Sequence, residues 1–352
     1  MRSLRPTREK SRILVNARFL GRRMTGVERY ALEVTRRLGN QVGMVAPFRS
    51  LQGLAGHLWE QAYLPYRVSS QNLLWSPANS GPLSVENQVV TLHDLSVIDH
   101  PEWFRSSFAA WYSYLLPRLV KRVRKVITDS IFSKSRILEE FCISEDKVAI
   151  IPAGVDLTRF WPRSAAEISE VRSYYHLPQS YVLWVGTLEP RKNLPGLLQA
   201  WQRVHTQFPE VQLVLVGGKV ALFRDAQMKN GLEGVHLSGY VPDADLPAFY
   251  SGALAFILPS LYEGFGLPAL EAMACGVGVI ASDRAALPEV VGQAGLLVNP
   301  TDTEDIASAI ARMLSDEALR LACSRKGLER AKSFSYDLTA ERIFNELSQL
   351  LG

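Results

Sequence analysis

The stretch ALAFILPSLYEGFGLPALEAMACGVGVIASD, residues 253–283, carries the pattern that predicts the fold class. It begins with a short apolar run, Ala253–Pro259, and ends with a second one, Gly278–Asp283, with a helix-like segment between them. A strand, a helical crossover and a second strand in this order form the βαβ unit of a parallel sheet. We therefore predict an α/β fold.

Similar apolar runs recur along the chain and fall into two sets. The first set comprises Ile13–Phe19, Val42–Pro47, Asn72–Pro77, Val89–Asp94, Lys125–Ser130 and Lys147–Pro152. The second set comprises Tyr181–Gly186, Val211–Gly217, Val235–Tyr240, Ala253–Pro259, Gly278–Asp283 and Gly295–Val298. Residues 155–178 between them contain Pro162 and Pro178 and show no strand alternation, so we place a domain junction there. The sequence predicts two doubly wound, Rossmann-like domains, over residues 1–155 and 156–333.

Composition restricts the class of protein. Of the 352 residues, 47% are hydrophobic and 21% charged, which is typical of globular domains and excludes a disordered or coiled-coil chain. No segment reaches the roughly 20 apolar residues of a membrane span. Residues 1–12 are basic, but no apolar core follows them, which disfavours a secretory signal. The three cysteines lie far apart without metal-ligand spacing, and this favours a reducing, cytoplasmic setting.

Charge is distributed unevenly between the two halves of the chain. Residues 1–170 hold 24 Lys and Arg against 16 Asp and Glu, whereas residues 171–352 hold 15 against 19. A basic half indicates an acidic partner. No zinc-finger, helix-turn-helix or RNP-like pattern accompanies the charge, so nucleic acid is disfavoured and an anionic membrane surface is the other candidate.

The loop after Ala253–Pro259 combines glycines with two carboxylates. Gly264 and Gly266 allow a ligand to approach backbone N–H groups at a helix N-terminus, which favours an anion. Glu263 and Glu271 are eight residues apart, which predicts Glu263 in the loop and Glu271 in an exposed first turn. Carboxylates accept hydrogen bonds from paired sugar hydroxyls. The loop therefore predicts a nucleotide-sugar site.

A second loop, GTLEPRKN, follows the strand-like run Tyr181–Gly186 and begins with Gly186 and Thr187. Arg191 and Lys192 are adjacent cations suited to the oxygens of a diphosphate. By itself this loop would be better explained as a solvated basic turn, and the glycine loop with its two carboxylates is what favours a diphosphate site.

Two weaker candidates lie in the first domain. Gly26, in the loop GRRMTG, would let the backbone pass close to a phosphate or sugar, and His93 ends the run VVTLHD. An imidazole at the end of a strand can hydrogen-bond a sugar hydroxyl, although a structural histidine fits nearly as well. The histidines show no ligand spacing, and the chain lacks GxGxxG, GxSxG and HExxH. We expect no metal and no cofactor.

The run EGFGLPALEAMACGVGVIASDRAALPEVVGQAGLLVNP closely resembles the E-x7-E region of the retaining glycosyltransferases of family 4. GTLEPRKNL, SGYVPDADLPAFYSGA, HDLSVIDHPEWF, TDSIFSKSRI, IPAGVD and TGVERY resemble further signatures of its mannosyltransferase-like branch. The resemblance covers residues 13–350. It implies the GT-B fold, in which two Rossmann-like domains face a central cleft. It also implies that a C-terminal helix, about 334–352, crosses back onto the first, acceptor-side domain, and that 156–333 bind the donor.

The resemblance assigns roles to individual positions. The catalytic residues it implies are His93, which meets the donor sugar, Arg191 and Lys192, which hold the diphosphate, and Glu263, which holds the transferred sugar. The donor-binding residues it implies are Gly26, Gly186, Thr187, Tyr240, Val241, Gly264, Phe265, Gly266 and Glu271. Glu271 would hold the ribose, and the backbone at Tyr240 and Val241 would hold the base. Thr187 stands where relatives often have arginine, and Glu28 where many have a small residue.

These roles predict a retaining hexosyltransferase. We expect it to move mannose or a related sugar from a GDP-linked donor to a lipid-linked or saccharide acceptor in lipopolysaccharide, O-antigen or exopolysaccharide synthesis. The alternatives are a nucleotide-sugar epimerase of similar fold and an inactive sugar-nucleotide-binding protein. We expect the protein to be cytoplasmic. One basic segment is the candidate for contact with the inner face of the plasma membrane.

That segment is RLVKRVRK, residues 118–125. Helical spacing would place Arg118, Lys121, Arg122 and Lys125 on one face. Aromatic residues precede it at positions 103, 104, 111 and 112. Cations beside aromatics suit a lipid headgroup interface, whereas buried aromatics beneath a solvated basic face explain the same residues equally well.

Overall fold

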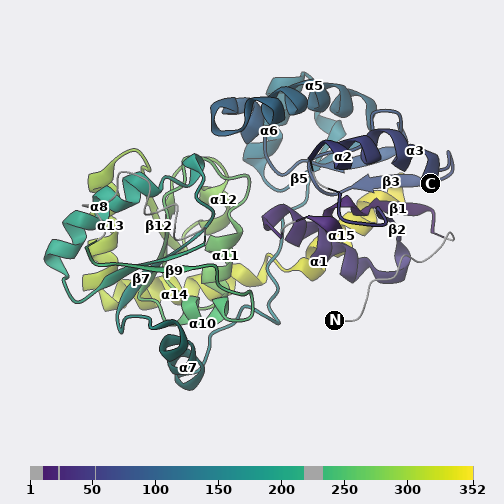
Figure 1. Cartoon of the computed structure of the whole chain (residues 1–352). Helices are drawn as coiled ribbons and strands as arrows, with labels where there is room; N and C mark the ends of the chain where they lie inside the picture. The colour runs from purple at the N-terminus through teal and green to yellow at the C-terminus, as the bar shows by residue number, and fades with distance from the viewer. Residues whose placement is uncertain (1–10, 23, 52, 218–232, 352) are drawn as a thin grey trace. The chain divides into compact units, whose positions relative to one another are not determined.

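The computed structural model describes residues 11–22, 24–51, 53–217 and 233–351, so the basic residues among 1–10 lie outside the described residues. Its internal contacts divide the chain into two units (Figure 1). Unit 1 comprises Met1–Gly154 and Tyr336–Gly352, and unit 2 comprises Val155–Ser335. The sequence boundaries, after residue 155 and at about 334, lie close to these divisions.

Unit 1 contains a parallel sheet with the strand order β2-β1-β3-β4-β5-β6. Its strands are β1 (Ile13–Asn16), β2 (Gly43–Val45), β3 (Leu73–Ser76), β4 (Gln88–Thr91), β5 (Lys125–Thr128) and β6 (Val148–Ile150). Val15 pairs in register with Met44 on one side and Trp75 on the other. Central strands such as β3 are buried throughout, which explains their nearly continuous apolar sequences.

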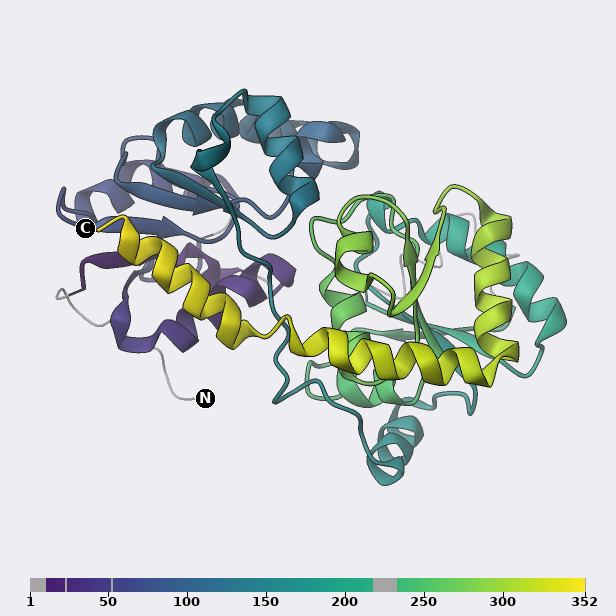
Figure 2. The ribbon, with the colours of Figure 1, turned by 180° about the vertical axis from the view of Figure 1, so that it is seen from behind.

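The helices of unit 1 come from both ends of the sequence. They are α1 (Gly26–Leu38), α2 (Gly53–Leu58), α3 (Leu64–Arg67), α4 (Ser96–Asp99), α5 (Ser106–Arg122), α6 (Ile131–Phe141) and α15 (Tyr336–Gln349). A π-helical turn, Trp59–Tyr63, joins α2 to α3. Helix α15, drawn in yellow in Figure 2, packs against α1, and Arg37 of α1 pairs with Asp337 at 2.8 Å. The C-terminal segment therefore belongs to the same unit as the N-terminal strands.

Unit 2 contains the second parallel sheet, with the order β12-β11-β10-β7-β8-β9. Its strands are β7 (Tyr181–Val185), β8 (Gln212–Val216), β9 (Val235–Gly239), β10 (Ala255–Leu258), β11 (Val279–Ser282) and β12 (Gly295–Val298). Its helices are α7 (Ala165–Tyr175), α8 (Leu194–Gln207), α10 (Leu246–Ser251), α11 (Leu267–Ala274), α12 (Leu287–Val291), α13 (Thr303–Ser315) and α14 (Glu317–Lys332). Trp184 of β7 and Trp201 of α8 are fully buried in its core. The predicted pair of doubly wound parallel sheets is confirmed.

The strand orders locate the positions at which ligands bind in such sheets. The direction of winding reverses between β1 and β3 in unit 1, and between β7 and β10 in unit 2. Ligands of open α/β sheets bind beyond the carboxyl ends of the strands at this switch point. In unit 2, the two loops singled out from the sequence follow β7 and β10.

The prediction that four cations share one helical face is wrong for Lys125. Arg118, Lys121 and Arg122 are exposed on α5, but the helix ends at Arg122. Val123 takes extended backbone and buries its side chain, so the chain turns into the sheet and Lys125 becomes the first residue of β5. Its Nζ lies 3.1 Å from a carboxylate oxygen of Glu346. Among the described residues, no helix is long and apolar enough to cross a membrane.

Candidate active site

A buried charged cluster joins the loops that follow β7 and β10. The carboxylate of Glu263 accepts hydrogen bonds from Lys192 Nζ at 2.5 Å and from Arg191 Nη1 at 2.8 Å. Ser260 Oγ donates to the same carboxylate at 2.8 Å. Lys192 and Glu263 are each only 5% exposed. Lys192 and Glu263, two predicted site residues that are 71 positions apart in the sequence, thus form one ion pair.

The backbone explains why the cations lie at this place. Residues Pro190–Lys192 form a single 3-10 turn after β7, and Asn193 ends it in the left-handed region with φ of +53°. The side-chain nitrogen of Asn193 donates to the carbonyl of Pro300 at 2.6 Å. The amide of Leu261 donates to the carbonyl of Arg191 at 2.7 Å and ties the two loops together.

Glu189 is a member of this cluster that our sequence reasoning missed. Arg191 Nε donates to one Glu189 oxygen at 2.6 Å, and Thr187 Oγ1 donates to the other at 2.7 Å. The signal was present in GTLEPRKN, where a carboxylate stands two residues before the arginine. Thr187, in the place of the family arginine, therefore supports a carboxylate and does not supply a further cation.

Ionisation in the cluster is mutually dependent. Burial alone would raise the pKa of the Glu263 carboxyl, but Lys192 and Arg191 lower it to about 2. Burial lowers the pKa of the Lys192 ammonium, and Glu263 opposes that shift. Burial would also raise the pKa of the Glu189 carboxyl. Its interactions with neighbouring groups, of which the charge of Arg191 is the largest, outweigh burial and lower the pKa. Two cations and two carboxylates therefore balance one another.

The glycine loop leads directly into α11. Gly266 has φ of +105°, and a Cβ there would lie 2.5 Å from Leu287 Cδ2, so the position requires glycine. Pro268 occupies the first turn, where its missing N–H costs nothing. Phe265 is buried, with its ring edge-on to that of Phe334 at 5.7 Å. Gly264 is also buried, next to the charged Glu263.

Glu271 differs from its predicted environment. The sequence predicts an exposed first turn, but α11 begins at Leu267, so Glu271 lies in the second turn and is 5% exposed. The hydroxyl of Tyr250 in α10 donates to its carboxylate at 2.9 Å. The prediction of exposure is therefore wrong, because α10 packs against this turn of α11.

The other candidates of unit 2 lie at the carboxyl ends of neighbouring strands. Gly186 follows β7 and approaches Gly217 so closely that a Cβ on Gly217 would lie 2.0 Å from the Gly186 carbonyl oxygen. Tyr240 and Val241 follow β9, with Tyr240 exposed and Val241 buried. These positions border the end of the sheet that carries the charged cluster.

His93 has partners within unit 1 for both ring nitrogens. Nδ1 lies 2.6 Å from Asp129 Oδ2, and Nε2 lies 3.0 Å from the carbonyl oxygen of Pro77. Because a carbonyl only accepts, Nε2 carries a proton. Burial would lower the pKa of His93, but Asp129 outweighs it and the pKa is raised. A hydrogen bond from this ring to a sugar stays a prediction, and it would require one of these contacts to open.

Gly26 is exposed as the first residue of α1. Glu28, two residues later, is buried and accepts a hydrogen bond from Thr25, and it pairs with Arg22 at 3.4 Å. In the parts of the chain that the structure describes, no group of three or more His, Cys, Asp or Glu side chains could hold a metal ion.

Comparison with known proteins identifies the family to which each part of the chain is similar. Residues 175–330 match the family model "Glycosyl transferases group 1", and residues 73–159 match "Glycosyltransferase Family 4". The chain is 36% identical over 270 residues to O-antigen chain mannosyltransferase B of Escherichia coli, covering 75% of this chain and 71% of that protein. It is 29% identical over 285 residues to the serotype-specific mannosyltransferase WbdA of Escherichia coli, covering 78% of this chain but only 34% of that longer protein.

A solved structure gives the same result for the fold. Sucrose-phosphate synthase from Thermosynechococcus elongatus superposes with a TM-score of 0.73 at 22% identity, over 96% of this chain and 98% of the other. At this identity the likeness concerns the fold alone, and it extends over both units.

Proposed function

The chain belongs to the family 4 glycosyltransferases, and from that premise we propose that it transfers mannose from a GDP-linked donor to a saccharide acceptor with retention of the anomeric configuration. The glycosyltransferase activity follows from the family. Mannose is supported by the names of the relatives, which are mannosyltransferases. The relatives' names also support a role in O-antigen synthesis, with a lipid-linked or saccharide acceptor.

The observation that carries the proposal is the cluster at the switch point of unit 2. Lys192 and Arg191 can neutralise the charge that grows on the diphosphate as the bond from the sugar C1 to the phosphate oxygen breaks. The N-terminus of α11, reached through Gly264 and Gly266, offers further donors. The acceptor oxygen then bonds to C1 on the face that the diphosphate leaves, and its proton passes to the diphosphate.

Glu263 has a separate role in this scheme. Without donor, its carboxylate balances Lys192 and Arg191. A bound diphosphate supplies negative oxygens to the same cations, and Glu263 becomes able to accept hydrogen bonds from the hydroxyls of the transferred hexose. Diphosphate binding and sugar recognition are thereby coupled through one carboxylate.

Glu271 is proposed to hold the donor ribose, and this gives a testable prediction. Glu271→Gln should weaken GDP binding by about 1.5 to 3 kcal/mol, because a hydrogen bond to a charged group is lost. Calorimetric titration measures the effect. Tyr250→Phe, which removes only the hydroxyl that orients Glu271, should weaken binding less. Equal affinities of wild type and Glu271→Gln would remove Glu271 from the site.

The experiment that tests the function starts from the donor. Thermal unfolding with GDP- and UDP-sugars should show selective stabilisation, which amounts to about 2.7 kcal/mol at 100 times the dissociation constant. With the stabilising donor and a mannoside acceptor, we expect a product that keeps the donor's anomeric configuration by NMR and forms in the presence of EDTA. An inverted product would contradict the proposed stereochemistry.

The same assay separates the alternatives. An epimerase would convert the donor to a free isomer without acceptor, and an inactive binding protein would be stabilised by donor without turnover over a broad acceptor panel. Donor alone and donor with acceptor should therefore be compared in parallel.

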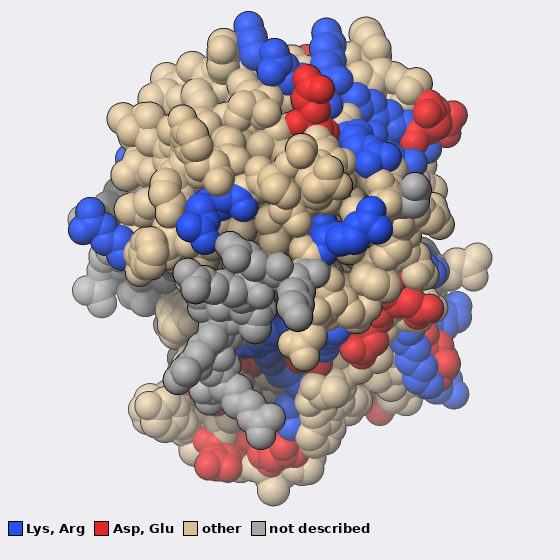
Figure 3. Space-filling model, turned by 90° about the vertical axis from the view of Figure 1, so that its right-hand side faces the viewer, with Lys and Arg blue, Asp and Glu red and all other residues tan. Residues whose placement is uncertain are grey.

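We also propose that unit 1 contacts anionic lipid through α5. Figure 3 shows one face of the molecule, on which Lys and Arg side chains are spread out, several of them next to Asp or Glu. Neutralising the exposed Arg118, Lys121 and Arg122 should abolish cosedimentation with phosphatidylserine-containing vesicles at moderate salt, since each cation contributes on the order of 1 kcal/mol. Neutralising Arg325, Lys326 and Lys332, three exposed cations of α14, is the matched control. Wild-type protein that stays in the supernatant at low salt would exclude this contact.

A further inference from the structure

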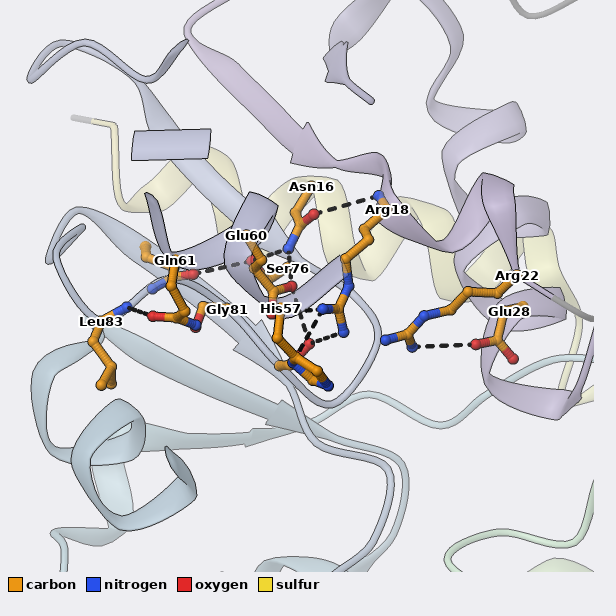
Figure 4. A network of polar contacts seen from close by, with 12 residues as sticks. Asn16, Arg18, Arg22, Glu28, His57, Glu60, Gln61, Ser76, Gly81 and Leu83 are labelled. Carbon is orange, nitrogen blue, oxygen red and sulfur yellow. Dashed lines mark hydrogen bonds and ion pairs between the residues drawn. The ribbon is translucent and has the colours of Figure 1, made fainter. Parts of the chain in front are cut away.

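Unit 1 has its own buried charged cluster at its switch point. None of its charged residues was singled out from the sequence, and Trp111 was named only as an aromatic residue before the basic segment. Figure 4 shows Arg18, which follows β1, reaching toward Glu60 and His57. Arg18 Nη1 lies 3.3 Å from Glu60 Oε2, and both side chains are almost fully buried. We call Arg18, His57, Glu60 and Trp111 the unit 1 cluster.

Neighbouring polar groups hold the ion pair in place. Asn16 Nδ2 donates to Glu60 Oε1 at 2.7 Å, and Ser80 Oγ donates to the same oxygen at 3.0 Å. Arg18 Nη2 donates to Ser80 Oγ at 3.1 Å. A buried ion pair seldom stabilises a fold more than apolar residues of the same volume would. Charged side chains buried at the carboxyl ends of strands are instead typical of binding sites.

The contact between Arg18 and His57 determines which nitrogen of the imidazole carries its proton. Arg18 Nη1 lies 3.2 Å from Nδ1 of His57, and because a guanidinium only donates, Nδ1 accepts. Burial and then the charges of Arg18 and Arg22 lower the pKa of His57 to about 4. The ring is therefore neutral near pH 7, and its proton is on Nε2.

His57 can donate a hydrogen bond from Nε2 to a ligand. Its side chain is only partly buried, and among the described residues none accepts a hydrogen bond from Nε2. The ring of Trp111 lies edge-on at a centroid distance of 5.2 Å, and that of Tyr112 at 6.1 Å. Within the described chain, the indole Nε1 of Trp111 is buried without a hydrogen-bond partner, which is uncommon for a native donor.

Two ion pairs among the described residues neutralise the arginines near His57. Arg18 pairs with Glu60, and Arg22 pairs with Glu28 at 3.4 Å. Within the described residues, a ligand at the partly exposed His57 therefore meets its Nε2–H group beside aromatic rings, and both of these arginines already have a carboxylate partner. That combination suits the hydroxyls and the C–H surface of a sugar, and it gives no advantage to a phosphate.

We infer that the unit 1 cluster binds an uncharged hexose unit of the acceptor, with His57 Nε2 donating to a sugar oxygen and Arg18 positioning the imidazole. The inference rests on the proposed glycosyltransferase function and specifies its acceptor. Phosphorylated groups of an acceptor would then bind elsewhere than at this switch point.

The test uses the full-length protein and ligand-detected NMR with methyl α-mannoside and an α-linked mannobiose. His57→Phe should weaken binding at least tenfold and raise the KM for a mannoside acceptor, with kcat changed much less. His57→Gln, whose amide can still donate, should restore part of the affinity. His100→Phe, at a histidine of the same unit that is also partly buried, is the matched control. GDP affinity should stay unchanged in all three variants.

Three outcomes would overturn the inference. The first is that His57→Phe and wild type bind the saccharides with equal affinity. The second is that mannose 1-phosphate binds ten times more tightly than methyl α-mannoside and that this difference depends on His57. The third is that the wild-type protein binds GDP but binds no saccharide. A wild-type protein that binds no nucleotide or nucleotide sugar would instead contradict the proposed function, and the NMR titration would still report on the unit 1 cluster.

Discussion

Replacing Lys192 with Met should lower kcat about 100- to 1,000-fold, equivalent to about 2.7 to 4 kcal/mol of transition-state stabilisation. Lys192 Nζ is buried and already held by Glu263, so its charge is positioned before the donor arrives. Negative charge on the diphosphate grows as the glycosidic bond breaks, so the loss should fall on turnover more than on donor affinity. Initial rates at saturating donor, with calorimetric titration of GDP, measure the two effects separately.

Controls make this result specific. Met keeps most of the aliphatic length of Lys192, so packing in the buried site is preserved. Lys326→Met, at an exposed position of α14 in the same unit, should leave the rate unchanged. A Lys192→Met enzyme within about twofold of wild type, less than roughly 0.5 kcal/mol, would show that this ammonium does not stabilise the leaving group.

Glu263→Gln should destabilise unit 2 in the absence of ligand and make it unusually responsive to nucleoside diphosphate. Removing one charge of a buried pair costs about 3 to 5 kcal/mol, because the other remains uncompensated. The glutamine side chain still has an oxygen that can accept a hydrogen bond, so we expect a cost near the lower value, about 3 kcal/mol. That cost corresponds to a fall of about 6 to 12 °C in unfolding temperature for a unit of this size. GDP or UDP, whichever binds the wild type, should raise the unfolding temperature of the variant more than that of wild type. Scanning calorimetry measures both shifts.

The pH dependence of the same carboxyl gives an independent check. The pKa of Glu263 is about 2 in the folded protein, below the ordinary value near 4.5. Its contribution to stability is therefore present above about pH 4.5 and is lost as the pH falls toward 2. Glu263→Gln should remove this acid-sensitive part, whereas Glu304→Gln, at an exposed pair with Arg203, should not. Equal unfolding temperatures of Glu263→Gln and wild type would contradict the coupling between Glu263 and the two cations.

The parallel sheets could be predicted from the sequence because their signal is local. Both faces of each central strand are covered, so short runs such as Ala255–Leu258 are apolar throughout and end at residues that turn the chain. Arg191, Lys192 and Glu263 could be proposed for the same reason, since each lies in the loop that follows such a run. A glycine loop, a proline and a helix start are likewise encoded within a few residues of one another.

Contacts between distant residues could not be predicted in this way. The sequence does not indicate that α10 buries Glu271, or that the helix of the basic segment ends before Lys125. Glu60 and Arg18 are 42 positions apart, and the local sequence around either residue does not predict that they form an ion pair. The order of the strands determines which loops meet at a switch point, and that order depends on the packing of whole sheets. Local patterns therefore specify the strands, the helices and the types of loop, whereas only the tertiary structure decides which charges become partners, which are buried, and which nitrogen of a histidine remains to meet a ligand.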